Sequence, residues 1–202
     1  MLQIETFVFG PFGTNTYVVS GDERRVFLID PACSNAYEQQ QLLRYISSVL
    51  SPDGRLTVIA THGHLDHLWG APWVCEWWKT SVQMHEADIP LAKAMQRQYD
   101  LFGVRRVAVP FPMEPLHASD TYPFEILHTP GHTPGSVCLY YPQEKVLFSG
   151  DTLFQMGYGR TDLPGGDLHQ LIASLTRLME LPEDVKVYSG HGETTTIGEE
   201  KR

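Results

Sequence analysis

The chain has 202 residues, of which 42% are hydrophobic and 19% are charged, as is typical of a folded globular domain. Its net charge of −9 and the absence of a basic run argue against nucleic acid or an anionic membrane as a partner, because both favour clustered lysine and arginine. No apolar run approaches the roughly 20 residues that span a bilayer. We therefore expect one domain over residues 1–202 that acts on a small molecule.

Strands and helices are expected to alternate in the first half of the chain. Strands are predicted over residues 2–9, 16–20, 25–29, 56–60 and 81–85. Helices are predicted from Ser34 or Asn35 to about Leu50, over 65–80 with an interruption at Pro72, and over 87–99. The three tryptophans within residues 73–78 are interpreted as core. Residues 101–119 hold three prolines and are predicted to form an irregular surface loop, with a lid or a substrate wall as the alternative.

The second half repeats this pattern. Strands are predicted over 124–128, 137–141, 145–148 and 185–189, and a glycine-rich loop over 152–166. A helix is predicted from about Asp167 to Met179, with Leu168, Leu171, Ile172, Leu175 and Leu178 on one face. The alternation predicts mixed α/β packing, with two sheets between helices.

The three cysteines, Cys33, Cys75 and Cys138, are odd in number and widely spaced. This spacing predicts free, partly buried thiols in a reducing compartment, and neither a disulfide framework nor a thiolate metal site. The N-terminal residues lack the basic region and long apolar core of a signal peptide. The predicted location is therefore the cytoplasm.

Residues 61–67, Thr-His-Gly-His-Leu-Asp-His, concentrate three histidines and one carboxylate directly after a predicted strand. Imidazole and carboxylate are preferred ligands of zinc and similar divalent ions. The same order of apolar strand, small residues and a metal-type ligand recurs at His132, Asp151 and His191. Loops that follow strand ends meet at one edge of a sheet, so these residues are expected to converge. The sequence therefore predicts a metal centre.

Asp30 also stands at the end of a predicted strand. A buried carboxylate that supports the site and a simple turn residue are equally compatible with this position.

The motif His62-Gly63-His64-Leu65-Asp66-His67, followed by His132, Asp151 and His191, resembles the metallo-β-lactamase superfamily over nearly the entire chain. Residues 157–162 and 189–192 look most like its glyoxalase II (hydroxyacylglutathione hydrolase) branch. The resemblance implies the four-layer αβ/βα sandwich of that fold, with two mixed β-sheets flanked by helices. Two-domain glyoxalase II enzymes carry a helical C-terminal domain that supplies much of the glutathione recognition, and this chain stops shortly after His191.

The resemblance further implies two divalent metal ions, with zinc expected and iron or manganese as alternatives. His62, His64 and His132 would hold the first ion, and Asp66, His67 and His191 the second, with Asp151 and a hydroxide bridging them. The implied activity is hydrolysis of thioesters such as S-lactoylglutathione by that hydroxide. Asp66 would also act as a catalytic residue by orienting the hydroxide, and Asp30 would support a ligand from behind.

Other activities of related proteins give alternatives. A mononuclear iron persulfide dioxygenase would use His62, His132 and Asp151 as a two-histidine, one-carboxylate face. A nuclease or lactonase of the same superfamily is less favoured, the nuclease because the chain is acidic and lacks a basic insertion.

Two further groups of residues are assigned from their positions. Arg160 is expected either to bind an anionic substrate group or to pair with Asp162 in its own loop. The four histidines that do not match the motif are interpreted as structural or surface residues: His85, His117, His128 and His169.

Overall fold

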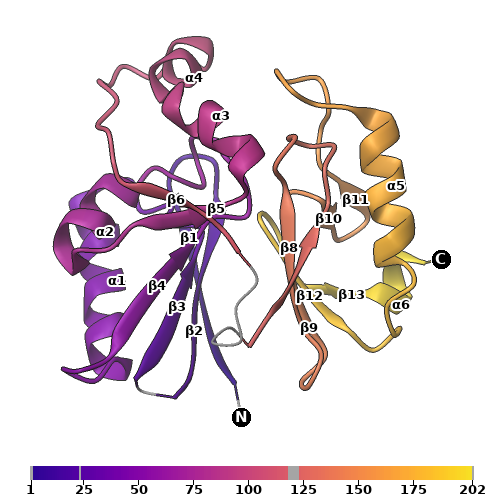
Figure 1. Ribbon diagram of the computed structural model, residues 1–202, viewed down its shortest axis with the longest axis horizontal. Coiled ribbons are helices and arrows are strands. Elements are labelled where there is room, and N and C mark those ends of the chain that lie inside the picture. Colours follow the sequence, from indigo (N-terminus) through magenta and orange to yellow (C-terminus); the bar gives the residue numbers. More distant parts are fainter. Residues whose placement is uncertain (1, 23, 118–122, 202) are drawn as a thin grey trace. The chain divides into compact units, whose positions relative to one another are not determined.

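Strands and helices alternate along the chain in the computed structural model, which describes residues 2–22, 24–117 and 123–201 (Figure 1). The chain divides into an N-terminal unit, residues 1–115, and a C-terminal unit, residues 116–202. Each unit has its own mixed β-sheet and its own helices. The prediction of a mixed α/β chain with two mixed sheets and flanking helices is therefore confirmed. That residues 1–202 behave as a single domain stays a prediction.

The N-terminal unit is built on a six-stranded sheet of order β1-β2-β3-β4-β5-β6. The strands are β1 (Gln3–Phe9), β2 (Thr14–Asp22), β3 (Arg25–Ile29), β4 (Arg55–Ile59), β5 (Val82–Met84) and β6 (Met113–Pro115). The pairs β1–β2 and β2–β3 are antiparallel, whereas the pairs β3–β4, β4–β5 and β5–β6 are parallel. Parallel strands end at one edge of a sheet, so the loops after β3 and β4 begin side by side.

Helices connect the parallel strands of this unit. They are α1 (Ala36–Val49), α2 (Ala71–Trp78), the 3₁₀ turn η1 (Glu86–Asp88), α3 (Ile89–Lys93) and α4 (Met95–Leu101). Leu42 and Ile46 of α1 and Val74 of α2 belong to one buried cluster with strand residues such as Leu28 and Val58. The burial of these apolar faces, rather than helix propensity, holds the short helices in place.

The first turn of α1 is closed by two side chains. Asn35 Oδ1 accepts hydrogen bonds from the backbone N–H groups of Tyr37 and Glu38, at 3.0 and 3.1 Å. The Glu38 carboxylate in turn accepts from the N–H groups of Ser34 and Gly10, at 2.6 and 3.2 Å. These bonds satisfy donors that a helix leaves open at its N-terminus, and they attach the helix to the loop after β1.

Asn35→Ala is expected to lower the free energy of unfolding by about 1 kcal/mol, because it removes the acceptor for two backbone donors. Urea unfolding followed by circular dichroism measures the change. Asn35→Asp keeps the acceptor and is the matched control, for which wild-type stability is expected. Equal stability of the alanine variant and the control would show that Asn35 does not cap α1.

Several expectations for the N-terminal unit need correction. The helix predicted over 65–80 begins only at Ala71, because Leu65 and Leu68 are buried in the core as part of a loop and Gly70 N–H donates to Pro31 O at 2.8 Å. Pro72 lies in the first turn of α2, where proline is tolerated. Trp73 and Trp78 pack against the core as expected, but Trp77 is 55% exposed.

The helix predicted over 87–99 is divided into η1, α3 and α4. The Gln98 side chain donates to Leu91 O at 2.9 Å and so occupies a carbonyl that a continuous helix would offer to Met95. The predicted irregular stretch 101–119 contains the strand β6, which adds to the sheet beside β5. Ala118 and Ser119 at its end lie outside the described residues.

The C-terminal unit has a five-stranded sheet of order β13-β12-β9-β8-β7. Its elements are β7 (Glu125–His128), β8 (Val137–Tyr141), β9 (Val146–Gly150), the hairpin β10 (Leu153–Phe154) and β11 (Gly157–Tyr158), α5 (Leu168–Leu178), β12 (Lys186–Ser189), β13 (Thr195–Thr196) and α6 (Ile197–Glu200). Because β7 and β9 are each antiparallel to β8, and β12 is parallel to β9, the strands β7, β9 and β12 all end at the same edge.

Helix α5 covers the core of this unit with a narrower face than expected. Leu171 and Leu178 are fully buried, and Leu175 is partly buried against the same cluster. Leu168 and Ile172, predicted on that face, are 47% and 53% exposed. The strand β13 and the helix α6 were not predicted, because two and four residues are too few to give a periodic pattern.

The three cysteines are free and buried, as predicted. Burial raises the pKa of the Cys33 thiol to about 12 and the pKa values of Cys75 and Cys138 to about 11. At neutral pH they are therefore neutral thiols, which are poor metal ligands and poor nucleophiles. Among the described residues, no helix is long and apolar enough to cross a membrane.

Candidate metal centre

The histidine-rich loop leaves strand β4 at the carboxyl-end edge of the N-terminal sheet. His62, His64 and His67 are buried, with exposed fractions of 1%, 7% and 0%. The ligand atoms of His62 and His64 lie within 4.8 Å of each other, as do those of His62 and His67 and those of Asp66 and His67. All four predicted ligands of this loop therefore lie together within one unit.

Two side chains from the helical segment after β5 hold the loop in this non-helical path. Asp88, which is fully buried, accepts from Gly63 N–H at 2.7 Å. Gln98 accepts from Leu65 N–H and donates to Gly63 O, both at 3.0 Å. A Cβ atom on residue 63 would lie 2.9 Å from Asp88 O, so glycine permits this close approach. The backbone donors and acceptors between the ligands are thus satisfied without a helix.

Asp30 is a support of this loop rather than a simple turn residue. Its carboxylate is 1% exposed and accepts from Thr61 N–H at 2.7 Å and from Thr61 Oγ1 at 2.8 Å. The same carboxylate lies 2.9 Å from His67 Nδ1. One buried side chain after β3 therefore orients both the start of the ligand loop after β4 and the ring of its last histidine.

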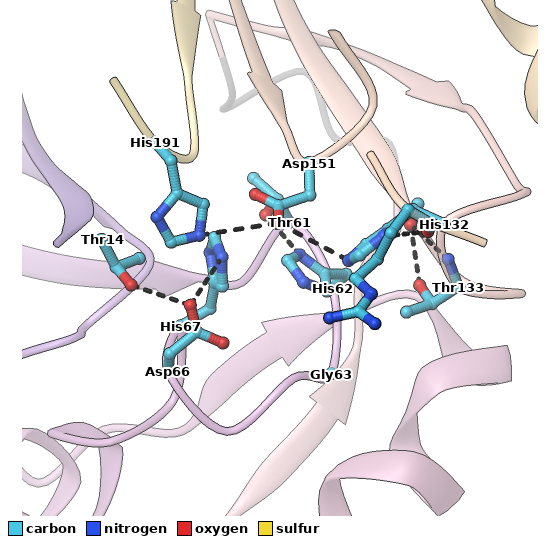
Figure 2. A network of polar contacts seen from close by, with 12 residues as sticks. Thr14, Thr61, His62, Gly63, Asp66, His67, His132, Thr133, Asp151 and His191 are labelled. Carbon is cyan, nitrogen blue, oxygen red and sulfur yellow. Dashed lines mark hydrogen bonds and ion pairs between the residues drawn. The ribbon is translucent and has the colours of Figure 1, made fainter. Parts of the chain in front are cut away.

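Asp66 is attached to the strand β2. Thr14 Oγ1 donates to Asp66 Oδ2 at 2.8 Å, as Figure 2 shows. The same carboxylate oxygen lies 3.4 Å from His67 Nε2. The side chain of Asp66 is 17% exposed, so it is the most accessible of these ligands and can meet a substrate or a water molecule.

The predicted ligands of the C-terminal unit also lie together. His132 follows β7, Asp151 follows β9 and His191 follows β12, so all three leave the shared strand edge described above. Asp151 Oδ2 lies 3.6 Å from His132 Nε2 and 3.6 Å from His191 Nε2 (Figure 2). Asp151 is thus the central residue of this group.

His132 is oriented by the backbone of the loop after β11. Its Nδ1 lies 2.7 Å from Arg160 O. A Cβ on residue 159 would lie 1.9 Å from Asp151 O and 3.0 Å from His132 Nδ1, so only glycine allows the backbone to pass at this distance. Gly159 therefore brings the carbonyl of the next residue to the histidine.

The protonation of three rings follows from these contacts. Arg160 O can only accept, so His132 Nδ1 carries the proton. The Asp30 carboxylate imposes the same tautomer on His67. Thr61 Oγ1 gives its own proton to Asp30 and lies 3.1 Å from His62 Nδ1, so it accepts from that ring. With the proton on Nδ1, Nε2 is the nitrogen of each ring that can offer a lone pair, which is the arrangement of histidines that ligate metals.

The donor set fits divalent metal ions. It combines imidazoles, three of which (His62, His67 and His132) are held through Nδ1, with the carboxylates of Asp66 and Asp151. Such sets suit zinc, iron and manganese, and neither sulfur nor a redox-active side chain takes part.

Arg160 and Asp162 form the loop pair that was one of the two expectations for Arg160. Arg160 Nε and Nη2 donate to the two oxygens of Asp162, both at 2.6 Å. The hydrogen bonds from Arg160 lower the pKa of Asp162 to about 2. Arg160 is therefore engaged within its own loop, and it is its backbone carbonyl that contacts His132.

The four histidines outside the motif belong to none of the groups of possible metal ligands among the described residues. His85 Nδ1 accepts from Ala87 N–H at the start of η1, at 3.2 Å, and His128 Nε2 lies 2.9 Å from Pro134 O. His117 and His169 are exposed. The interpretation of these residues as structural or surface residues agrees with their surroundings.

Several supporting residues were not found from the sequence. They are Thr14, Thr61, Asp88, Gln98 and the carbonyl of Arg160. A polar residue such as Gln98 between the apolar neighbours Met95 and Tyr99 is a weak signal of a buried hydrogen bond. A backbone carbonyl leaves no signal, because every residue has one.

Comparison with known proteins agrees with this geometry. Residues 9–191 match the family model of the metallo-beta-lactamase superfamily. The chain belongs to this superfamily.

Three relatives show how much of the chain is shared. Hydroxyacylglutathione hydrolase GloC of Haemophilus influenzae is 36% identical over 210 residues, which cover 100% of this chain and 96% of that protein. The crystal structure of TTHA1623 in a di-iron-bound form has a TM-score of 0.86 and 35% identity, covering 98% of this chain and 97% of the other. The crystal structure of BLEG-1 B3 metallo-beta-lactamase has a TM-score of 0.85 and 35% identity, covering 98% and 96%.

Proposed function

We propose that this metallo-hydrolase superfamily member is a binuclear metal-dependent hydrolase of thioesters such as S-lactoylglutathione. The observation that carries the metal assignment is the orientation of His62, His67 and His132, each held at Nδ1 by a protein acceptor so that Nε2 is presented as a ligand. The choice of thioester is supported by the similarity to hydroxyacylglutathione hydrolase GloC over the full chain.

The proposal joins the two ligand groups into one centre. His62, His64 and His132 would hold one ion, and Asp66, His67 and His191 the other, with Asp151 shared between them. Support comes from the family model, which extends over both groups, and from the complementary composition of the groups. Zinc is proposed as the metal, with iron or manganese as alternatives, since a relative with 35% identity has been solved in a di-iron-bound form.

Hydrolysis adds water across the acyl carbon–sulfur bond and yields a carboxylic acid and a free thiol. Bound divalent ions supply acidity to water at neutral pH and polarise a carbonyl group. Asp66 is accessible and is fixed by Thr14, so its carboxylate can accept a hydrogen bond from the attacking water and orient it. Asp30 and the Arg160 carbonyl keep their histidines from rotating during the reaction.

Metal analysis combined with a substrate panel tests the proposal. Protein saturated with zinc, and in a parallel sample with ferrous iron, is expected to retain about two ions per chain after gel filtration and to hydrolyse S-lactoylglutathione. Lactones, β-lactams and phosphodiesters serve as competing substrates; β-lactams are included because a B3 metallo-beta-lactamase is among the relatives. One ion or fewer per chain, or no thioester hydrolysis, contradicts the proposal.

The second candidate is a mononuclear iron persulfide dioxygenase. Support for iron as its metal comes from the relative solved in a di-iron-bound form, although that form holds two ions rather than one. Oxygen consumption with glutathione persulfide, dependent on ferrous iron and accompanied by a single ion per chain, would favour it over hydrolysis. The proposed location is the cytoplasm, supported by three free, buried cysteines.

A further inference from the structure

An exposed aromatic surface lies beside the ligand loop in the N-terminal unit. Three rings form it, and we call them the aromatic shelf: Phe12, Trp69 and Phe102. The Phe12 ring lies 6.1 Å from that of Trp69 and 5.9 Å from that of Phe102. Phe12 is 43% exposed and Phe102 is 38% exposed, whereas aromatic rings that serve packing alone are usually buried.

The shelf is connected to the ligands at two points. Trp69 follows His67 by two residues, so their Cα atoms are at most about 7 Å apart. Phe12 lies in the turn that leads to Thr14, whose hydroxyl holds Asp66. The shelf therefore belongs to the same part of the chain as Asp66 and His67.

The guanidinium group of Arg106 contacts the Trp69 ring of this shelf. Arg106 Cζ lies 5.2 Å from the centroid of the Trp69 ring, and Arg106 Nη2 donates to Ser34 O at 2.9 Å. The group is exposed, and a guanidinium has five N–H donors, so it can bind a further acceptor. The contact with the indole and the hydrogen bond to Ser34 O restrict the guanidinium, which reduces the entropy lost when an anion binds.

The loop that carries Arg106 is held against α4. Gln96 donates to Arg106 O at 3.3 Å and accepts from Ala108 N–H at 3.0 Å, and Val104 N–H donates to Tyr99 O at 2.8 Å. Tyr99 is buried and its ring contacts Trp69 at 5.8 Å. The cation and the shelf thus form one pre-arranged unit rather than a chance surface contact.

The charge of this segment is opposite to that of the chain. Residues 91–110 contain four basic side chains and one acidic side chain, whereas the whole chain has a net charge of −9. A local positive field in an acidic protein favours the approach of an anion to this place.

We propose that Arg106 and the aromatic shelf bind the anionic thiol carrier of the substrate and so determine its specificity. This proposal rests on the proposed thioesterase function. An acyl group such as lactoyl is small and uncharged, and offers nothing to a guanidinium. The thiol carrier of a glutathione thioester has carboxylates for a bidentate contact with Arg106 and flat amide groups that lie well on aromatic rings.

The test compares kinetic constants of Arg106→Gln for one acyl group on three carriers. With S-lactoylglutathione, KM is expected to rise by about tenfold to a hundredfold, the effect of losing a charge-assisted hydrogen bond, while kcat changes by less than about twofold. With the uncharged carrier N-acetylcysteamine, KM is expected to stay unchanged. Lactoyl-coenzyme A has a carrier with phosphate groups. If Arg106 also binds phosphate, KM for this substrate should rise in Arg106→Gln as it does for S-lactoylglutathione; if Arg106 binds only carboxylate, KM should stay unchanged.

Matched variants control for charge and for folding. Arg24→Gln removes the same charge from an exposed position. Arg24 directly precedes β3, whereas Asp30 follows that strand, and the Arg24 side chain is 72% exposed. This variant is expected to keep the wild-type KM. Arg106→Lys keeps the charge but not the fork, and should recover only part of the affinity. Phe12→Ala removes an exposed ring and should raise KM for carriers with amide groups.

The outcomes separate this proposal from the proposed function. An unchanged KM for S-lactoylglutathione in Arg106→Gln, or an equal rise with the uncharged carrier, overturns the proposal while leaving the hydrolase intact. If the wild type hydrolyses no thioester, the proposed function has failed, and calorimetric binding of S-methylglutathione to the metal-loaded protein still decides this proposal. Binding that is weakened in Arg106→Gln and retained in Arg24→Gln supports it; no binding by the wild type overturns it.

Discussion

Asp151→Ala is expected to abolish hydrolysis and to lower the metal content from about two ions per chain to one or fewer. Asp151 is the central residue of its group, with His132 Nε2 and His191 Nε2 both 3.6 Å from the same carboxylate oxygen. Changes to residues that merely support metal ligands typically reduce affinity or activity by about tenfold to a hundredfold, so loss of a shared ligand should exceed that range. Metal analysis and initial rates with S-lactoylglutathione measure both effects.

Asp184→Asn is the matched control for this experiment. It removes an equal charge from the loop before β12, and the side chain it replaces is 61% exposed and paired with Lys145. This variant is expected to keep both its metal and its activity. Full metal content together with full activity in Asp151→Ala would remove Asp151 from the proposed centre, provided that circular dichroism shows a folded protein.

Asp30→Asn is expected to have the second largest effect, although Asp30 is not among the proposed ligands. Asparagine tolerates the positive φ of 53° at this position, so the backbone can stay in place. The carboxylate serves three donors through both of its oxygens, whereas an amide has one oxygen and one NH₂ group. At least one buried donor must then face the NH₂ group.

This mismatch should appear in both stability and metal binding. We expect a loss of about 1–3 kcal/mol in the free energy of unfolding for each donor left unsatisfied, and an affinity for metal that is lower by about tenfold to a hundredfold. Urea unfolding of the metal-free protein and competitive chelator titration measure the two effects separately. Asp53→Asn, in an exposed loop where the side chain is 71% exposed, is the control. Wild-type values in Asp30→Asn would show that the carboxylate does not position His67.

The grouping of the proposed ligands within each unit was the most predictable feature of this protein, because their residue types are rare in such a dense arrangement and follow apolar strands. His132, Asp151 and His191 meet at one edge because β7, β9 and β12 end there, which the order of strand and ligand in the sequence already indicated. The strand β8 has the predicted limits, since Val137–Tyr141 is an unbroken run of apolar and aromatic residues.

Contacts between distant residues were the least predictable part. The loop over residues 65–70 has a helical pattern of leucines, yet it is held open by Gln98 and by Pro31 O, which lie 33 and 39 residues from their partners Leu65 and Gly70. Asp30 was ambiguous for the same reason: a carboxylate at a strand end supports a site only if donors from another loop reach it. Local sequence does not contain that information.

The supports of the histidines differ in how easily mutation can remove them. In the N-terminal unit, Asp30 holds His67 directly and His62 through Thr61, so one codon change disturbs two histidines together. In the C-terminal unit, His132 is held by a main-chain carbonyl, which persists whatever side chain residue 160 carries. Side-chain substitutions throughout the protein would therefore reveal the first support and overlook the second, except at Gly159, where any added carbon atom pushes the carbonyl away. Loss of function on substitution of Gly159, together with retained function on substitution of Arg160, would therefore indicate that the backbone carbonyl of Arg160 holds His132.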